Sequence, residues 1–229
     1  MYRRTQNARE AYFQQAVIFS IRICYTVLMN EHTQKIIQIA ELSLQFARVE
    51  RAVTHQDGIR PETDSDHTVM LGLVACTFAR ALYPKLDIGL VAQFALVHDL
   101  VEVYADDTPS FRITSDKKKE KEERELAAIV RIREEYQGRY DFMPNMIERY
   151  ETLDCSEARL IKTLDKCLPK ITHYLNGATF FKKTGVSKED TILFFSNQLE
   201  EIRNGYGSEF PEIVLVLEEL HKKCLEIAY

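Results

Sequence analysis

The sequence predicts an all-α protein that folds as a compact helical bundle. Glycine is rare, with eight residues in a chain of 229, and there are only six prolines, which disfavours a turn-rich β fold. Apolar residues recur at helical spacing along most of the chain, and no alternating strand pattern of useful length is visible. Because hydrophobic residues make up 45% of the chain, it can bury a core without relying on disulfides.

The expected helices rest on this periodicity and on residues that begin or end helices. They cover about residues 31–53, 68–82, 88–104, 117–137, 144–153, 156–175, 187–203 and 211–229. Pro84 closes the second helix and Pro109 the third, because proline cannot continue the hydrogen-bonded ladder. Ser187 with Asp190 predicts a capping box before the seventh helix, and Pro211 suits the first turn of the last.

The first 28 residues differ in character from the rest of the chain, and Met29 directly precedes a polar sequence that opens a helix. We therefore divide the chain into an N-terminal extension, residues 1–28, and a main domain, residues 29–229. The extension is either an accessory helix or the product of an overlong start assignment. Its apolar part, residues 16–29, is too short to span a bilayer and contains Arg22. We expect a soluble, cytoplasmic protein with no membrane partner.

The net charge and the cysteine content narrow the class of protein further. The net charge of -5 and the isoelectric point near 5.8 argue against a general nucleic-acid binder, so no nucleic-acid polymer is expected as a partner. The five cysteines are scattered, and none forms a C-x-x-C pair. That pattern fits a reducing compartment in which thiols serve as small buried hydrophobes.

The most apolar segment of the chain contains His98, Asp99 and Glu102. Burying such groups costs several kcal/mol unless they are paired or bind a cation. If the segment is one helix, His98 and Glu102 lie one turn apart on the same face. Because grouped, desolvated titratable residues mark functional sites, we favour a site here over a structural polar cluster.

The sequence evidence for two further members of this group is weaker. His67 lies where a polar loop passes into a helix, and alone it is an ordinary residue near a helix N-terminus. Asp165 lies on an otherwise apolar helix, where a salt bridge to Lys162 or Lys166 is the plain alternative.

The order His67, then His98-Asp99, then the distant Asp165 resembles the HD superfamily of metal-dependent phosphohydrolases. Three segments are similar to its 5'-deoxynucleotidase-like branch: residues 61–67, residues 98–109 and residues 150–167. The likeness covers about residues 36–177. It implies an HD-domain helical bundle and a metal-dependent phosphomonoesterase that removes phosphate from nucleoside or deoxynucleoside 5'-monophosphates.

The resemblance makes His67, His98, Asp99 and Asp165 the ligands of one divalent metal ion. Two imidazoles and two carboxylates suit Mn²⁺, Co²⁺, Fe²⁺, Zn²⁺ or Mg²⁺, and the sequence does not choose among them. The interval between Asp99 and Asp165 contains no histidine. HD sites with two metals generally insert histidines there, so this absence favours a mononuclear site.

The same resemblance gives Glu102 and Asp107 the catalytic roles of moving protons and positioning water. We assign substrate contacts to Arg51, Asp107 and Ser110. Relatives carry an Arg-Trp pair that orients the phosphate, whereas here Arg51 is followed by Ala52 and the chain has no tryptophan. Arg60 is an alternative phosphate partner, and for either arginine a solvent-exposed position is the plain alternative.

Other functions stay open at this point. The substrate could be another nucleotide, such as an alarmone or a triphosphate, because HD proteins support all of these reactions. The chain could also be a non-catalytic module that binds a nucleotide or a metal. In each case the expected partner is a small nucleotide, and a homodimer through the apolar terminal helices is compatible with the sequence.

Overall fold

A computed structural model describes residues 29–109, 111 and 113–229. The expected extension, residues 1–28, and the proposed substrate contact Ser110 lie outside the described residues. The chain divides after Leu44 into two units, which we describe separately. Helix α2 (Glu31–Phe46) begins in the first, where Asn30 Oδ1 accepts a hydrogen bond from the backbone N–H of Thr33 at 2.9 Å and caps the helix.

The second unit confirms the all-α prediction, since its regular structure is helical apart from two short strands. Its elements are β1 (Glu50–Thr54), β2 (Pro61–Thr63), α3 (Asp64–Leu82), α4 (Ile88–Val97), α5 (Glu102–Ala105), α6 (Ser115–Glu135), η1 (Gly138–Tyr140), α7 (Phe142–Thr152), α8 (Ser156–Asp165), α9 (Leu168–Leu175), α10 (Thr179–Thr184), α11 (Lys188–Asn204), η2 (Gly207–Glu209) and α12 (Pro211–Ala228).

The first helix is shorter than the sequence predicts. It ends at Phe46 instead of Val53, and the residues after it form β1, which pairs with β2 as an antiparallel hairpin. In β1 only Val53 is fully buried, so the strand shows no alternating apolar pattern. Gly58 lies in the connecting turn at φ +69°, a conformation that glycine adopts without strain.

Two expected helices are each broken in two. Residues 98–101 separate α4 from α5, and there the backbone N–H of Glu102 bonds to the carbonyl of Asp99 at 2.9 Å, three residues back. His98 and Glu102 therefore do not lie on one continuous helix, although both line the same cavity. The second break separates α8 from α9 after Asp165, because Pro169 has no N–H with which to bond the carbonyl four residues before it.

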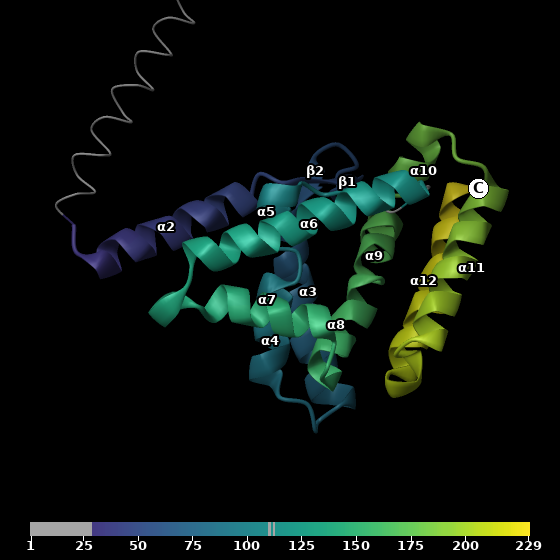
Figure 1. The fold of residues 1–229 in the computed structure, drawn as a ribbon. Helices are drawn as coiled ribbons and strands as arrows, with labels where there is room; N and C mark the ends of the chain where they lie inside the picture. The colour runs from purple at the N-terminus through teal and green to yellow at the C-terminus, as the bar shows by residue number, and fades with distance from the viewer. Residues whose placement is uncertain (1–28, 110, 112) are drawn as a thin grey trace, which may run out of the picture. The chain divides into compact units, whose positions relative to one another are not determined.

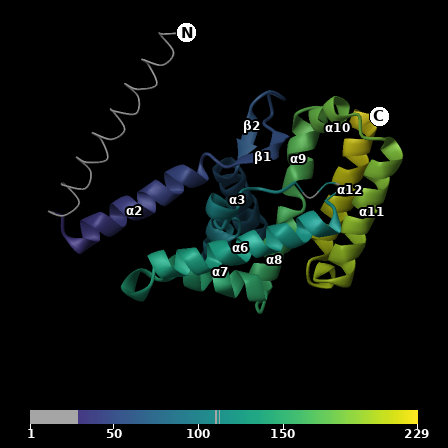
Figure 2. The same ribbon diagram turned by 45° about the horizontal axis from the view of Figure 1, so that its top comes forward.

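The helices pack in a chain of neighbours (Figure 1). α3 packs against α4, and α8 contacts both of them, while α7 covers α4 and α6 contacts α5 and α7. α9 leads from α8 to the pair α11 and α12, which lie side by side in both views (Figure 2). Two bends, between α4 and α5 and between α8 and α9, thus come next to the start of α3.

The predicted helix ends are largely confirmed elsewhere. Ser187 Oγ accepts a hydrogen bond from the backbone N–H of Asp190 at 3.1 Å and caps α11. α12 begins at Pro211 as expected, whereas the short α10 was not anticipated. Of the described cysteines, Cys76, Cys155, Cys167 and Cys224 are free thiols.

Among the described residues, Ile88–Ala105 is the one stretch long and apolar enough to cross a bilayer by length and composition. Its mean hydropathy is 1.4 over 18 residues, and half of it is buried inside the fold. It is bent between α4 and α5 and packs against α3, α7 and α8. These are the properties of a core segment.

Candidate functional site

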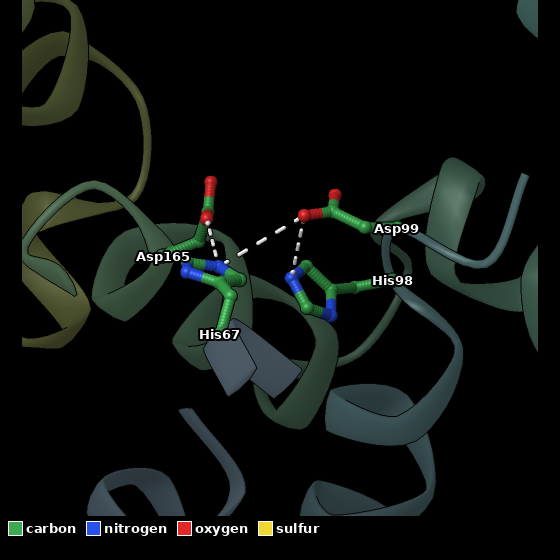
Figure 3. Close-up of side chains that lie close together, drawn as sticks. All are labelled: His67, His98, Asp99 and Asp165. Carbon is green, nitrogen blue, oxygen red and sulfur yellow. Dashed lines mark hydrogen bonds and ion pairs between the residues drawn. The ribbon is translucent and has the colours of Figure 1, made fainter. Parts of the chain in front are cut away.

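Four residues predicted to hold a metal ion come together from three elements of the second unit. His67 lies in the first turn of α3, His98 and Asp99 follow the end of α4, and Asp165 ends α8. Figure 3 shows the four side chains pointing toward one another. One ligand atom from each lies within 4.8 Å of all the others. The structure thus assembles the cluster that the sequence predicted.

The start of α3 is fixed locally. Thr63 caps the helix, and the backbone N–H of Asp66 donates to Thr63 Oγ1 at 3.2 Å while Asp66 Oδ2 accepts from the backbone N–H of Thr63 at 3.1 Å. This capping box satisfies donors that the first helical turn leaves free. It holds His67, one residue further along, in a fixed place on the helix.

The distances within the cluster suit a divalent cation. His67 Nε2 lies 3.0 Å from Asp165 Oδ1 and 3.9 Å from Asp99 Oδ2, and His98 Nε2 lies 3.1 Å from Asp99 Oδ2. Both imidazoles are buried, whereas the Asp99 and Asp165 side chains keep 19% and 14% of their surface exposed. The nitrogens therefore form the closed side of the cluster and the carboxylates the open side.

The tautomer of His98 also fits a metal ligand. His98 Nδ1 lies 2.8 Å from the carbonyl oxygen of Ala95, which can only accept, so Nδ1 carries the proton. In the neutral ring the lone pair is then on Nε2, which is buried, lies 3.1 Å from Asp99 Oδ2 and has no hydrogen-bond partner among the described residues. An orphaned imidazole nitrogen beside carboxylates is what a bound cation would satisfy, so the residues present fit a metal ion.

Glu62 belongs to the site, and sequence reasoning missed it. Its Oε1 lies 3.4 Å from His67 Nδ1, and its Oε2 accepts a hydrogen bond from Thr172 Oγ1 at 2.9 Å. Glu62 is only 3% exposed. A carboxylate behind a ligating histidine orients the ring and increases its basicity. Its place five residues before His67, at the start of a polar stretch, was the available signal.

The Arg51 side chain is 11% exposed and lies among carboxylates. Its Nη1 donates to Asp99 Oδ2 at 2.8 Å and to Asp64 Oδ1 at 2.9 Å, and it lies 3.9 Å from Glu102 Oε2. Asp64, also missed from the sequence, is fully buried. The structure thus places Arg51 at the site, and the solvent-exposed alternative is wrong for it. Its contact with the substrate phosphate stays a prediction.

The two remaining candidates, Asp107 and Arg60, lie in different surroundings. Asp107 lines the same cavity as the cluster, whereas the Arg60 side chain is 56% exposed and approaches Asp66 at 3.4 Å. The exposed alternative therefore holds for Arg60. Asp165 also lies 3.5 Å from Lys166, so the plain salt bridge exists beside the cluster and does not replace it.

The electrostatics of the cluster are strongly coupled. Burial, together with the charges of Asp99 and Asp64, raises the pKa of Glu102 far above its ordinary value of 4.5. Burial opposes ionisation of Asp99 too, but His98 and Arg51 overcome it and hold the pKa of Asp99 well below its usual range. For His67, burial lowers the pKa, and the contacts with Asp165 and Glu62 outweigh it and raise the pKa to about 9.

The cluster opens into one cavity of about 250 Å³. One end is lined by charged groups, and the other end is lined by phenylalanines with Lys170. The charged end is formed by Arg51, His98, Asp99, Glu102, Asp107 and Asp165, with Lys121 beside Glu102 and Lys166 beside Asp165. Burial raises the pKa of Asp107, and nearby Asp99 adds to this, whereas Arg51 and Lys121 lower it. The charged end thus presents the cationic groups of Arg51, Lys121 and Lys166 together with several carboxylates, whose mutual repulsion a bound cation would reduce.

Comparison with characterised sequences identifies relatives. The chain is 28% identical over 136 residues to human 5'-deoxynucleotidase HDDC2, a match that covers 58% of this chain and 64% of the human protein. It is 30% identical over 131 residues to the 5'-deoxynucleotidase HDDC2 of Danio rerio, covering 56% of this chain and 63% of the relative. The chain thus matches slightly less than two thirds of the length of these relatives.

Solved structures share the fold. A protein from Magnetospirillum magnetotacticum MS-1, described as a "Predicted metal-dependent phosphohydrolase", aligns with a TM-score of 0.69 and 22% identity over 85% of this chain and 93% of its own. A conserved hypothetical protein from Pyrococcus furiosus aligns with a TM-score of 0.56 and 21% identity, over 81% and 99% of the two chains. A family model for the HD domain matches residues 45–204. The chain therefore belongs to the HD-domain family.

Proposed function

We propose that the chain is a metal-dependent phosphomonoesterase that hydrolyses nucleoside or deoxynucleoside 5'-monophosphates. The observation that carries the proposal is the convergence of His67, His98, Asp99 and Asp165 within 4.8 Å at one end of a cavity. Relatives named 5'-deoxynucleotidase HDDC2 support the choice of substrate class. A family fold alone does not fix a substrate, so the site carries the argument.

These four residues would hold one divalent cation, with Nε2 of each histidine and one oxygen of each aspartate as ligand atoms. The chemistry that such a cation supplies when bound is Lewis-acid polarisation of the phosphoryl group and neutralisation of its charge. Glu62 would keep the His67 ring in place. Arg51 would hold Asp99 and Asp64 through its paired hydrogen bonds.

Glu102 is the residue that we assign to proton transfer. Its carboxyl is buried at the charged end of the cavity, and its Oε2 has no hydrogen-bond partner among the described residues. Positive charge next to it would lower its pKa toward neutrality, which is the range in which a carboxylate works best as a general base for water. Asp107, which follows α5 and lines the same cavity, would orient the departing 5'-oxygen.

The test is phosphate release from a panel of nucleoside and deoxynucleoside monophosphates, with Mn²⁺, Co²⁺, Fe²⁺, Zn²⁺ and Mg²⁺ added one at a time. We expect metal-dependent release that is lost in His98→Ala. In Glu102→Ala metal binding should persist, while turnover falls about 10²-fold or more. A metal-loaded chain that binds a monophosphate and cleaves none would instead be a non-catalytic module. Selective cleavage of a triphosphate or an alarmone would show that the substrate is a different class of nucleotide.

A further inference from the structure

The far end of the cavity is lined by aromatic rings, which we call the aromatic lobe: Phe111, Phe180, Phe181, Phe194 and Phe195. Phe181 and Phe195 are buried behind the others, and Phe111, Phe180 and Phe194 are only partly buried. Phe111 contacts Phe194 at a centroid distance of 4.8 Å with their planes inclined by 64°. The partly exposed rings therefore present apolar surface to the cavity.

One cation lies in this apolar lobe. Lys170, on α9, is 4% exposed and lines the cavity. Its Nζ lies 5.5 Å from the ring centroid of Phe194 and 5.8 Å from that of Phe195. Within the described part of the chain no carboxylate forms an ion pair with this ammonium, and burial, followed by the nearby Lys166 charge, lowers its pKa to about 8. A buried lysine without a counter-ion is costly to keep.

Two further polar side chains, His173 and Gln198, line the cavity, and His173 has an unpartnered nitrogen. His173 lines the cavity, is 7% exposed and has an Nδ1 that is buried without a hydrogen-bond partner. Gln198 also lines the cavity and is buried, and its Oε1 lies 3.4 Å from His221 Nε2. Buried polar atoms are nearly always hydrogen-bonded, so the unpartnered His173 Nδ1 indicates a ligand with a polar group of its own.

We propose that the aromatic lobe is the nucleobase subsite and that Lys170 donates to the O6 and N7 edge of a 6-oxopurine, so that guanine and hypoxanthine nucleotides are preferred. This inference rests on the proposed function, because the phosphate must lie at the metal cluster. Asp165 and Lys170 line the same cavity and are joined by the α8–α9 bend. A nucleotide bound across that bend would place its two ends at the two ends of the cavity.

A base fits the aromatic lobe better than a second phosphate does. Phosphate is a dianion, and bringing it among phenyl rings would leave Lys170 as its nearest cationic partner there, at a large desolvation cost. A base is neutral and planar, so it can stack on the partly exposed rings of Phe180 and Phe194 without that cost.

The preference among bases follows from donors and acceptors. The lysine ammonium offers three donors and no acceptor. Guanine and hypoxanthine present two acceptors, O6 and N7, on one edge, which is the edge that lysine reads in guanine. Adenine replaces O6 with an amino donor, which faces the ammonium unfavourably. His173 and Gln198 remain for the rest of the base edge.

The experiment compares kcat/KM for dGMP, dIMP, dAMP and dCMP in the metal-loaded full chain and in Lys170→Met, which keeps the length of the side chain and removes its donors. We expect the variant to lose at least about 10-fold for dGMP and dIMP and less than about 3-fold for dAMP and dCMP. Lys170→Arg should retain part of the preference. Lys182→Met, an exposed lysine on α10, is the matched control.

An equal loss for all four nucleotides, or none, would overturn the proposal, since a structural or phosphate-binding lysine would not distinguish bases. If Lys170→Met does not fold, as judged by thermal unfolding, the test uses the ratio of kcat/KM for dGMP to kcat/KM for dAMP in the wild type and in Lys170→Arg. A wild-type ratio near one that is unchanged in Lys170→Arg refutes the proposal. If the wild type hydrolyses no monophosphate, the proposed function fails. The subsite is then judged by calorimetric binding of dGMP and dAMP with Mn²⁺, and equal affinities would refute it.

Discussion

Replacing Lys170 by methionine is expected to stabilise the fold at neutral pH. The ammonium is 4% exposed, and burial lowers its pKa from the ordinary 10.5 to about 8. The difference of about 2.5 between these pKa values corresponds to about 3 kcal/mol of unfolding free energy at pH 7. Methionine has a similar length, is apolar and adapts to its surroundings, so it avoids this cost without leaving a cavity.

The test is how the free energy of unfolding depends on pH. Between pH 8 and 10.5 the unfolded chain holds the Lys170 proton and the folded chain releases it, so the stability of the wild type rises with pH across this window. Lys170→Met lacks that rise, and its advantage should shrink as the pH increases. Urea unfolding at pH 7, 8, 9 and 10, with Lys182→Met as an exposed control, measures this. A variant less stable than the wild type at pH 7, or a constant difference from pH 7 to 10, would refute the reasoning.

Three further changes probe the site and its surroundings. Asp165→Ala should abolish high-affinity divalent metal binding measured by calorimetry, and retention of wild-type affinity would remove Asp165 from the ligand set. Glu62→Ala should weaken metal affinity about 10- to 100-fold by releasing the His67 ring, with Glu62→Gln intermediate. Burial, with the Lys170 charge, lowers the pKa of His173 to about 4, so the unfolded chain binds more protons between pH 4 and 6.5, and stability falls as the pH drops through that window. Acid unfolding of His173→Phe should show a smaller loss, by about 3 kcal/mol at most, and an unchanged acid midpoint would contradict this.

The metal cluster could be predicted because its residues carry their signal locally. His98 and Asp99 stand out as ionisable groups in an apolar segment, and their order with His67 and Asp165 matches the family pattern. The structure then brings the four together.

Residues that reach the site through tertiary folding could not be predicted in the same way. Asp64 and Glu62 lie close to His67 in sequence, but only the hairpin brings Arg51 to Asp64 and Asp99. In β1 a single buried residue gives too weak a pattern to identify the strand. The break before α9, by contrast, could have been inferred from Pro169, because an interior proline disrupts helical hydrogen bonds.

The hydrogen bond between Arg51 and Asp99 has a consequence for folding. Asp99 Oδ2 is shared by Arg51 Nη1 at 2.8 Å and His98 Nε2 at 3.1 Å, and it belongs to the set that would ligate a cation. The hairpin thus supplies the acidic cluster with an internal counter-charge. Small zinc domains unfold when chelated, because metal binding supplies their folding free energy. Here the Arg51 guanidinium offsets part of the repulsion among the acidic groups without any ion. A chelator should therefore abolish the proposed activity while leaving the tertiary structure intact.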